Sequence, residues 1–102
     1  MADEAEVVLR NADRDRYEIW IGDALAGFSV YQEDGDRTAF IHTEVDPAFG
    51  GRGLGTVLAR GALDDAVGRG RVIVPLCPFI ARYLRKNSGY EEHVRWPDDV
   101  SR

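Results

Sequence analysis

The sequence predicts an α+β fold, in which an antiparallel meander of four strands is followed by a β-α-β crossover and a C-terminal helix. Two observations carry this prediction. Up to residue 45, short segments alternate between apolar and polar side chains and are separated by turn residues, which is typical of half-buried strands. From residue 54 the apolar period lengthens to that of a helix, and a helix that joins two neighbouring strands makes them parallel.

Alternation is clearest in the second expected strand, where Tyr17, Ile19 and Ile21 fall on one face. Turn residues mark the ends of two hairpins, with Gly22-Asp23 after the second strand and Asp34-Gly35 after the third. Strands joined by such short turns lie side by side and run antiparallel. The four expected strands are Val7–Leu9, Tyr17–Ile21, Ala24–Gln32 and Arg37–Val45.

The first helix is expected to start near Gly55 and to end at the glycines Gly68 and Gly70. Gly61 lowers the stability of a helix, so we expect it where the helix lies close against the sheet. The apolar run Val72–Val74 predicts a buried strand that is parallel to the preceding strand. The buried stripe of this helix is expected to comprise Leu54, Leu58, Ala62 and Ala66.

A second helix is expected to open at Pro78, because proline is favoured in the first turn of a helix. This helix should stop by Asn87–Gly89, and a polar tail follows from Arg95. The apolar residues that it carries are Phe79, Ile80, Tyr83 and Leu84.

Length and composition describe a single soluble domain. The 102 residues suffice for one core, so we expect one domain over 1–102, with its core at about 7–94 and a polar tail at 95–102. The 44% of hydrophobic and 30% of charged residues are ordinary for a globular protein. The net charge of −5 argues against nucleic acid as the main ligand and favours amine-bearing partners. The sequence has no apolar run long enough to span a membrane, no leader and only one cysteine, so the chain is expected to be cytoplasmic. No metal site is expected.

The glycine-rich segment before the first helix is the strongest functional signal. Its glycines, among them Gly51 and Gly53, leave backbone N–H groups bare where a helix begins, and a helix N-terminus attracts anions. A phosphate-bearing ligand is therefore expected there. A P-loop is excluded because its lysine is missing, and a dinucleotide fingerprint is excluded because Leu58 stands where its third glycine belongs. A glycine-rich turn that binds no ligand is the alternative.

A longer pattern runs through the same segment and comprises Val45, Pro47, Gly51, Gly53, Leu54 and Gly55. It resembles the acyl-CoA loop of the GNAT acetyltransferase superfamily, Val-x-Pro-x-x-Arg-Gly-x-Gly-Leu-Gly. Gly50 stands where that superfamily usually has Arg or Gln, and Arg52 follows two residues later. The resemblance implies that acetyl-CoA binds here, with its pyrophosphate held by the backbone of Gly51–Thr56. The residues implied in binding acetyl-CoA are Val45, Gly50, Gly51, Arg52, Gly53, Leu54, Gly55 and Thr56.

Two further motifs point to a small, single-domain GNAT-like family. These are His42-Thr43 before the loop and Pro75–Pro78, which reads Pro-Leu-Cys-Pro, after the second core strand. The usual GNAT fold has two helices between its first strands, whereas 11–16 leaves room only for a turn. Its last strands are absent here or reduced to Tyr90–Val94. The resemblance implies that the pantetheine arm of acetyl-CoA lies between the fourth strand and the strand after the first helix.

Acetyl transfer to an amine needs a base that removes a proton from the amine. Glu44 is the best-placed carboxylate, one residue before the loop, and alternation puts His42 on the same face of the strand. A His–Glu pair can relay a proton. The alternatives are a solvated glutamate at a strand edge and a histidine that only satisfies a hydrogen bond.

Two other residues are candidates for the transfer. Many GNAT enzymes protonate the departing CoA thiolate with a tyrosine on the second helix, and Tyr83 lies in that helix; the alternative is a phenol packed in the core. Cys77 is expected to be the N-cap of the helix that Pro78 opens, where a thiolate is favoured and can carry the acetyl group covalently. Alternatively, Cys77 is a small side chain that lines the pantetheine cleft.

Together these interpretations predict an acetyl-CoA-dependent N-acetyltransferase whose acceptor is an amine, with protein and peptide amines among the candidates. The alternative is a non-catalytic acyl-CoA-binding or interaction module, since the missing front helices leave little to enclose a small acceptor. Neither nucleic acid nor a membrane is an expected partner. Both a monomer and a homodimer are compatible with the exposed edges of so small a sheet.

Overall fold

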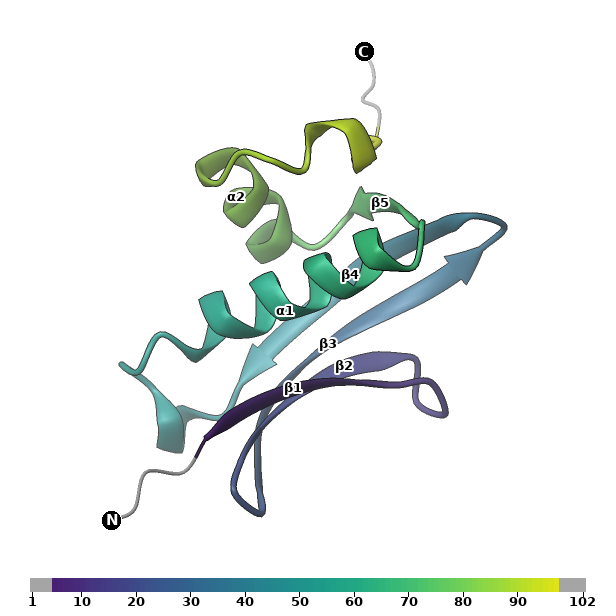
Figure 1. Ribbon diagram of the computed structural model, residues 1–102. Helices are drawn as coiled ribbons and strands as arrows, with labels where there is room; N and C mark the ends of the chain where they lie inside the picture. Colours follow the sequence, from purple (N-terminus) through teal and green to yellow (C-terminus); the bar gives the residue numbers. More distant parts are fainter. Residues whose placement is uncertain (1–4, 98–102) are drawn as a thin grey trace.

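Five strands form one sheet in the computed structural model, which describes residues 5–97 (Figure 1). The sheet order is β1-β2-β3-β4-β5, antiparallel from β1 to β4 and parallel between β4 and β5. This is the predicted α+β order. The elements are β1 Glu6–Asn11, β2 Arg16–Ile21, β3 Ala24–Asp34, β4 Arg37–Val45, the 3-10 helix η1 Pro47–Phe49, α1 Leu54–Gly68, β5 Val72–Pro75, α2 Pro78–Lys86 and the 3-10 helix η2 Glu91–His93.

Two-residue turns close the β2–β3 and β3–β4 hairpins, as the sequence predicts, but the second of these turns lies one residue later than expected. Asp34 still belongs to β3 and pairs with Arg37, so Gly35 and Asp36 form the turn. Gly35 has a φ of +59°, and Gly22 in the other turn has a φ of +55°. A tight hairpin turn needs such left-handed backbone, which explains why the glycine, and not the preceding aspartate, sits inside the loop.

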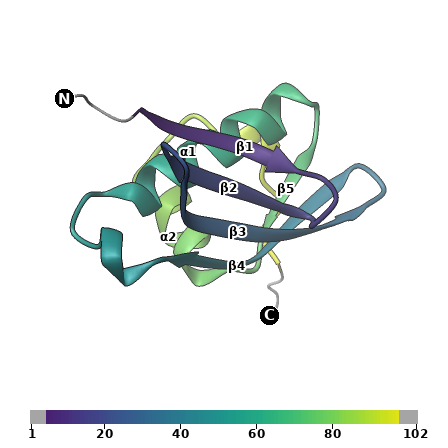
Figure 2. The same ribbon diagram turned by 90° about the horizontal axis from the view of Figure 1, so that it is seen from below.

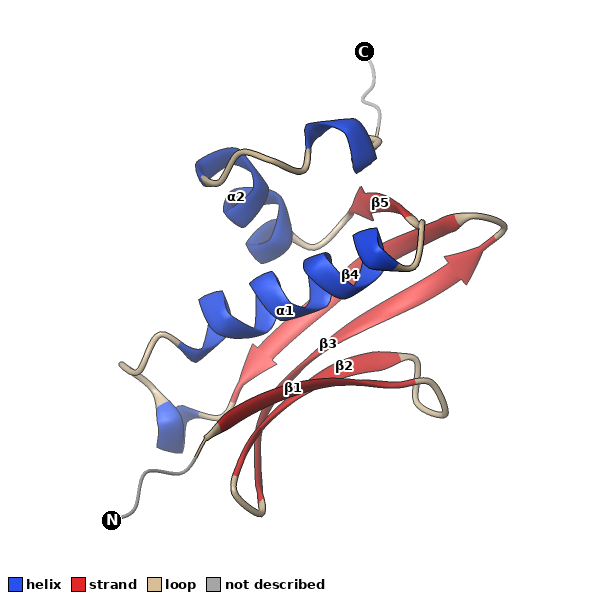
Figure 3. Cartoon of the chain, in the orientation of Figure 1, coloured by secondary structure: helices blue, strands red, loops and turns tan. Residues whose placement is uncertain are grey.

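Both helices pack on one face of the sheet, and Figure 2 looks onto the opposite face with the helices behind it (see also Figure 3). Tyr17, Ile19 and Ile21 of β2 all point toward α1 and are buried, which confirms the predicted alternation. The predicted stripe of α1 is also buried, and α2 adds to the same core. The buried residues that the two helices contribute are Leu54, Leu58, Ala59, Ala62, Leu63, Ala66, Ile80, Ala81, Tyr83 and Leu84.

Burial of β5 is less complete than predicted. Ile73 is fully buried under the helices, whereas Val72 and Val74 are half-buried. Alternation sends these two valines to the face that no described helix covers, so only every second residue of the run is shielded.

The predicted remnant of a final strand is a single bridge. Val94 pairs with Ile73 as an isolated parallel bridge, and the N–H of Arg95 donates to the carbonyl of Ile73 at 2.8 Å. Most of the segment around it forms η2 instead. The described part of the polar tail ends at residue 97.

The uncovered face of the sheet carries a buried carboxylate, Glu18, which is 3% exposed. Its oxygens accept hydrogen bonds from Arg16 at 2.7 Å, Trp20 at 3.0 Å and Asn11 at 3.0 Å. Burial acts to raise the pKa of Glu18, but these three donors outweigh it, and the pKa lies below its ordinary value. The charged form therefore stabilises the fold above the ordinary pKa, and this contribution is lost as the pH falls through the lowered one.

Gly61 allows α1 to lie close against the edge strand β1, as predicted from its place in the helix. A Cβ atom at this position would lie 2.8 Å from both Cβ and Cγ1 of Val8. That distance is too short for any side chain, so glycine is needed for this approach.

We expect Gly61→Ala to destabilise the protein by about 1–3 kcal/mol through overpacking against Val8, more than the gain of about 1 kcal/mol in helix propensity. Urea unfolding measures this change. Gly68→Ala is the matched control, because Gly68 lies in the same helix and a Cβ there meets nothing within 4 Å. Gly68→Ala should leave the free energy of unfolding unchanged or raise it. An increase for Gly61→Ala would contradict the close approach of α1 to Val8.

Candidate functional site

The glycine-rich loop leaves β4 through a short 3-10 helix and enters α1. Asp46 caps η1, since its Oδ1 accepts a hydrogen bond from the N–H of Ala48 at 2.9 Å. Gly51 and Gly53 have φ values of +81° and +70°, and Gly53 is the N-cap of α1. Only glycine adopts this backbone without strain, so these two positions shape the loop.

Backbone donors gather at this loop. Within residues 5–97, no protein acceptor takes a hydrogen bond from the N–H groups of Gly51–Thr56, which lie in the loop and the first turn of α1. They border a hollow of about 310 Å³ that is lined by Val45, Phe49, Gly50, Gly51, Gly53, Leu54, Gly55, Thr56 and Phe79. Free N–H groups together with the positive end of a helix dipole form a ready site for an anion.

The charges around this hollow also favour an anion. No carboxylate lines it, and Arg52 of the loop holds its guanidinium 5.8 Å from the centre of the Phe49 ring, which borders the hollow. In the described part of the chain, Arg52 has no carboxylate within 4.0 Å. An anion in the hollow would therefore meet uncompensated positive charge.

Gly55 has a packing role that the sequence did not indicate. A Cβ on Gly55 would lie 2.8 Å from Cζ of Phe79, so α2 lies directly over the first turn of α1. The glycine makes room for this aromatic ring. The ring in turn forms one wall of the hollow.

A second feature of the site is the divergence of β5 from β4. The two strands pair only from Arg37 to Phe40, although β4 continues to Val45. The carbonyl of Phe40 accepts from the N–H groups of both Leu76, at 3.0 Å, and Cys77, at 2.7 Å, and the chain then turns into α2. Residues 41–45 thus have β3 on one side and no described strand on the other, so backbone groups along this edge are open to a ligand.

Cys77 lies at this divergence and is the N-cap of α2, as predicted. It is 3% exposed, and its Sγ makes no capping hydrogen bond. Instead, the thiol donates to Oγ1 of Thr43 at 3.4 Å, and the Thr43 hydroxyl is 2.9 Å from Oγ of the fully buried Ser29. Three polar side chains are therefore connected across β3, β4 and the start of α2.

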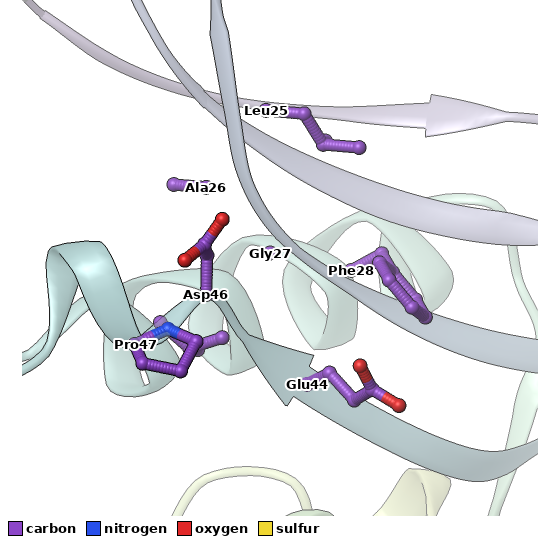
Figure 4. Close-up of a pocket in the computed structure, with 8 residues that line it drawn as sticks. Leu25, Ala26, Gly27, Phe28, Glu44, Asp46 and Pro47 are labelled. Carbon is purple, nitrogen blue, oxygen red and sulfur yellow. The ribbon is translucent and has the colours of Figure 1, made fainter.

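His42 and Glu44 lie on the opposite face of β4 and form the pair that alternation predicts. Nε2 of His42 is 2.7 Å from Oε2 of Glu44, and the two side chains are 55% and 59% exposed. Glu44 also lines a hollow of about 300 Å³ at the ends of β3 and β4. Figure 4 shows Phe28 of β3 beside the carboxylate of Glu44; Leu25 and Asp46 also line this hollow.

Tyr83 lies apart from these residues. It is 9% exposed, and its ring centre is 6.3 Å from that of Tyr90. The hydroxyl of Tyr90 donates to Asp64 of α1 at 2.6 Å, and burial together with this hydrogen bond raises the pKa of Tyr90. In the described residues Tyr83 shares no hydrogen bond with Cys77, His42 or Glu44; it lines a hollow between α1 and α2.

The structure thus places the predicted residues in three groups. His42 and Glu44 lie on one face of β4, Cys77 lies on the other face, and Tyr83 lies between the helices. Sequence reasoning missed Ser29 and the contact of Thr43 with the thiol. The available signal was a small polar residue at a core-facing position of β3. That signal is weak, because alternation gives the face of a strand but not the neighbour across it.

Residues 5–97 contain no group of three or more His, Cys, Asp or Glu side chains that could hold a metal ion. None of their helices is long and apolar enough to cross a membrane.

Residues 16–94 match the model of a protein family described as GCN5-related N-acetyl-transferase. The match begins with β2 and ends at the bridge formed by Val94, so it includes the glycine-rich loop, the His42–Glu44 pair and Cys77. A search of curated proteins found none that matches this chain.

Proposed function

We propose that this chain, which belongs to the family of GCN5-related N-acetyltransferases, transfers the acetyl group of acetyl-CoA to an amine. One observation carries the proposal: the unbonded N–H groups of Gly51–Thr56 border a hollow beside the open edge of β4. The hollow suits the pyrophosphate of CoA. The open edge suits the two amide groups of its pantetheine arm, which can pair with a strand as another backbone does.

In the proposed reaction the amine nitrogen attacks the carbonyl carbon of the thioester, the C–S bond breaks, and CoA leaves as a thiolate. Glu44 is the proposed base that removes the proton from the incoming ammonium. We propose that His42 passes this proton to solvent; it lies 2.7 Å from Glu44, and both side chains are more than half exposed. The thiolate takes its proton from solvent, because Tyr83, the candidate acid, lies apart in the hollow between α1 and α2.

The surroundings of Glu44 support a cationic acceptor. Glu44 and Asp46 both border the hollow shown in Figure 4, and Leu25 and Phe28 give it an apolar wall. Carboxylates beside apolar surface suit an amine on an aliphatic chain. The hollow lies on the uncovered face of the sheet, so it is also accessible to an amine carried by a protein or peptide.

Covalent catalysis through Cys77 is the rival mechanism, in which the thiolate takes the acetyl group from CoA and then passes it to the amine. The environment of the sulfur favours direct transfer. The Cys77 side chain is 3% exposed and its thiol donates to the Thr43 hydroxyl at 3.4 Å, as expected for a small buried side chain with a packing role.

A non-catalytic acyl-CoA-binding module is the second candidate function. The observation in its favour is the sheet face that no described helix covers, because little encloses a small acceptor there (Figure 2). CoA binding without release of CoA from acetyl-CoA in the presence of basic peptides would support this function instead.

Gly53→Val should weaken CoA binding at least about tenfold, or about 1.4 kcal/mol, because a β-branched residue at φ +70° must distort the cradle. Calorimetric titration with CoA measures this; micromolar binding by the unmodified protein corresponds to about −8 kcal/mol. Gly35→Val is the matched control, since it adds the same side chain at φ +59° in a distant hairpin. Unchanged binding by the Gly53 variant would overturn the assignment of the loop.

Glu44→Gln should lower the rate of acetyl transfer by a factor of about 10²–10⁴, because the variant lacks the base. CoA affinity should stay unchanged, since Glu44 does not line the glycine-loop hollow. The assay follows release of CoA from acetyl-CoA in the presence of a basic peptide. Glu92→Gln, at an exposed position on η2, is the control and should react like the unmodified protein; full activity of the Glu44 variant would remove its role as base.

Cys77→Ala should retain CoA affinity and most of the transfer activity, because direct transfer needs no covalent carrier. Mass spectrometry of the unmodified protein after incubation with acetyl-CoA alone should show no acetyl group on Cys77. An acetylated Cys77, together with an inactive variant, would establish the covalent route.

A further inference from the structure

A second hollow adjoins the one at the glycine-rich loop. Its volume is about 400 Å³, and it lies between the first turn of α1 and the outer side of α2. Its lining residues are Thr56, Phe79, Arg82, Tyr83, Lys86 and Asn87. Thr56 and Phe79 border both hollows, so the two are adjacent, and together we call them the groove along α2.

The far end of this groove is positively charged. Arg82 and Lys86 lie four residues apart on α2 and therefore point to the same side of the helix. No carboxylate lines either hollow, and neither cation has a carboxylate within 4.0 Å among residues 5–97. Lys86 is the only lysine of a chain whose net charge is −5.

One aromatic side chain, Phe79, holds the charge of Arg82 next to the loop. Cζ of Arg82 is 5.9 Å from the centre of the Phe79 ring, and Phe79 is the residue that packs over Gly55. The guanidinium is thereby held near the boundary of the two hollows. An anion bound at the loop and a second anion bound at Arg82 and Lys86 would be neighbours.

We propose that Arg82 and Lys86 bind the 3′-phosphate of CoA and make this protein select CoA over dephospho-CoA. This inference rests on the proposed function, since it extends the binding site of the same ligand. The adenosine of CoA carries that phosphate on the ribose that follows the pyrophosphate, so one molecule reaches both parts of the groove. Arginine offers a phosphate two parallel N–H donors, and lysine adds a compact charge.

The sides of the groove fit the rest of the adenosine. Phe79 and Tyr83 provide aromatic surface beside the two cations. Such surface suits a nucleoside whose phosphate is held at one end. Because the two cations are exposed, their contribution to affinity should also decrease as salt concentration rises.

The test compares calorimetric titrations of CoA and dephospho-CoA, which differ only in the 3′-phosphate. The unmodified protein should bind CoA at least about tenfold more tightly, as expected for charge-assisted hydrogen bonds to one phosphate. The double variant Arg82→Gln/Lys86→Gln should lose this preference and keep its affinity for dephospho-CoA. That retained affinity also shows that the variant is folded.

Arg85→Gln is the matched control, because Arg85 lies on the same helix but faces Trp96, with Cζ 5.1 Å from the centre of that ring. It should keep the full preference for CoA. Equal affinity of the unmodified protein for the two ligands, or a double variant that still prefers CoA or loses both ligands equally, would overturn the assignment. If the unmodified protein binds neither ligand, the proposed function itself fails, which is a different result.

Discussion

The divergence of β5 from β4 is the constraint on which the site depends. The carbonyl of Phe40 accepts from two successive N–H groups, those of Leu76 and Cys77, and this ends the parallel pairing. Pro78 then starts α2, because it fits the first turn of a helix and lacks the N–H that a strand would use. As a result the last part of β4 keeps an open edge, and Cys77 lies beside it. Without this divergence, the glycine-rich loop would face a closed sheet.

Glycines serve two different physical needs in this small domain. Gly51 and Gly53 supply left-handed backbone in a loop that borders the hollow and whose N–H groups have no acceptor among the described residues. Gly55 admits the ring of Phe79, and Gly61 admits Val8 of the edge strand. The first two positions shape a binding surface, whereas the other two allow close packing. One glycine-rich segment therefore both forms the cradle and lets α2 lie against it.

The sheet separates the two halves of the proposed chemistry. The cradle and Cys77 lie on the side of the helices, whereas the His42–Glu44 pair and its hollow lie on the uncovered side. Alternation along β4 produces this separation, since adjacent residues point to opposite faces. A thioester held along the open edge of β4 is thus accessible to an amine from the other face. On the same uncovered face, the deeply buried carboxylate of Glu18 is satisfied by three hydrogen bonds.

The sequence by itself determined the order of the elements, the direction of their pairing, the position of Cys77 at a helix start and the shared face of His42 and Glu44. Each of these follows from a period or a turn within a few residues, which is local information. Only the tertiary structure decided that the thiol meets Thr43, 34 residues away, and that Phe79 covers Gly55. The tertiary structure also decided that the hollow at Arg82 and Lys86 adjoins the hollow at the loop. A period tells which face of an element is buried, but the partner on that face depends on how distant elements pack together.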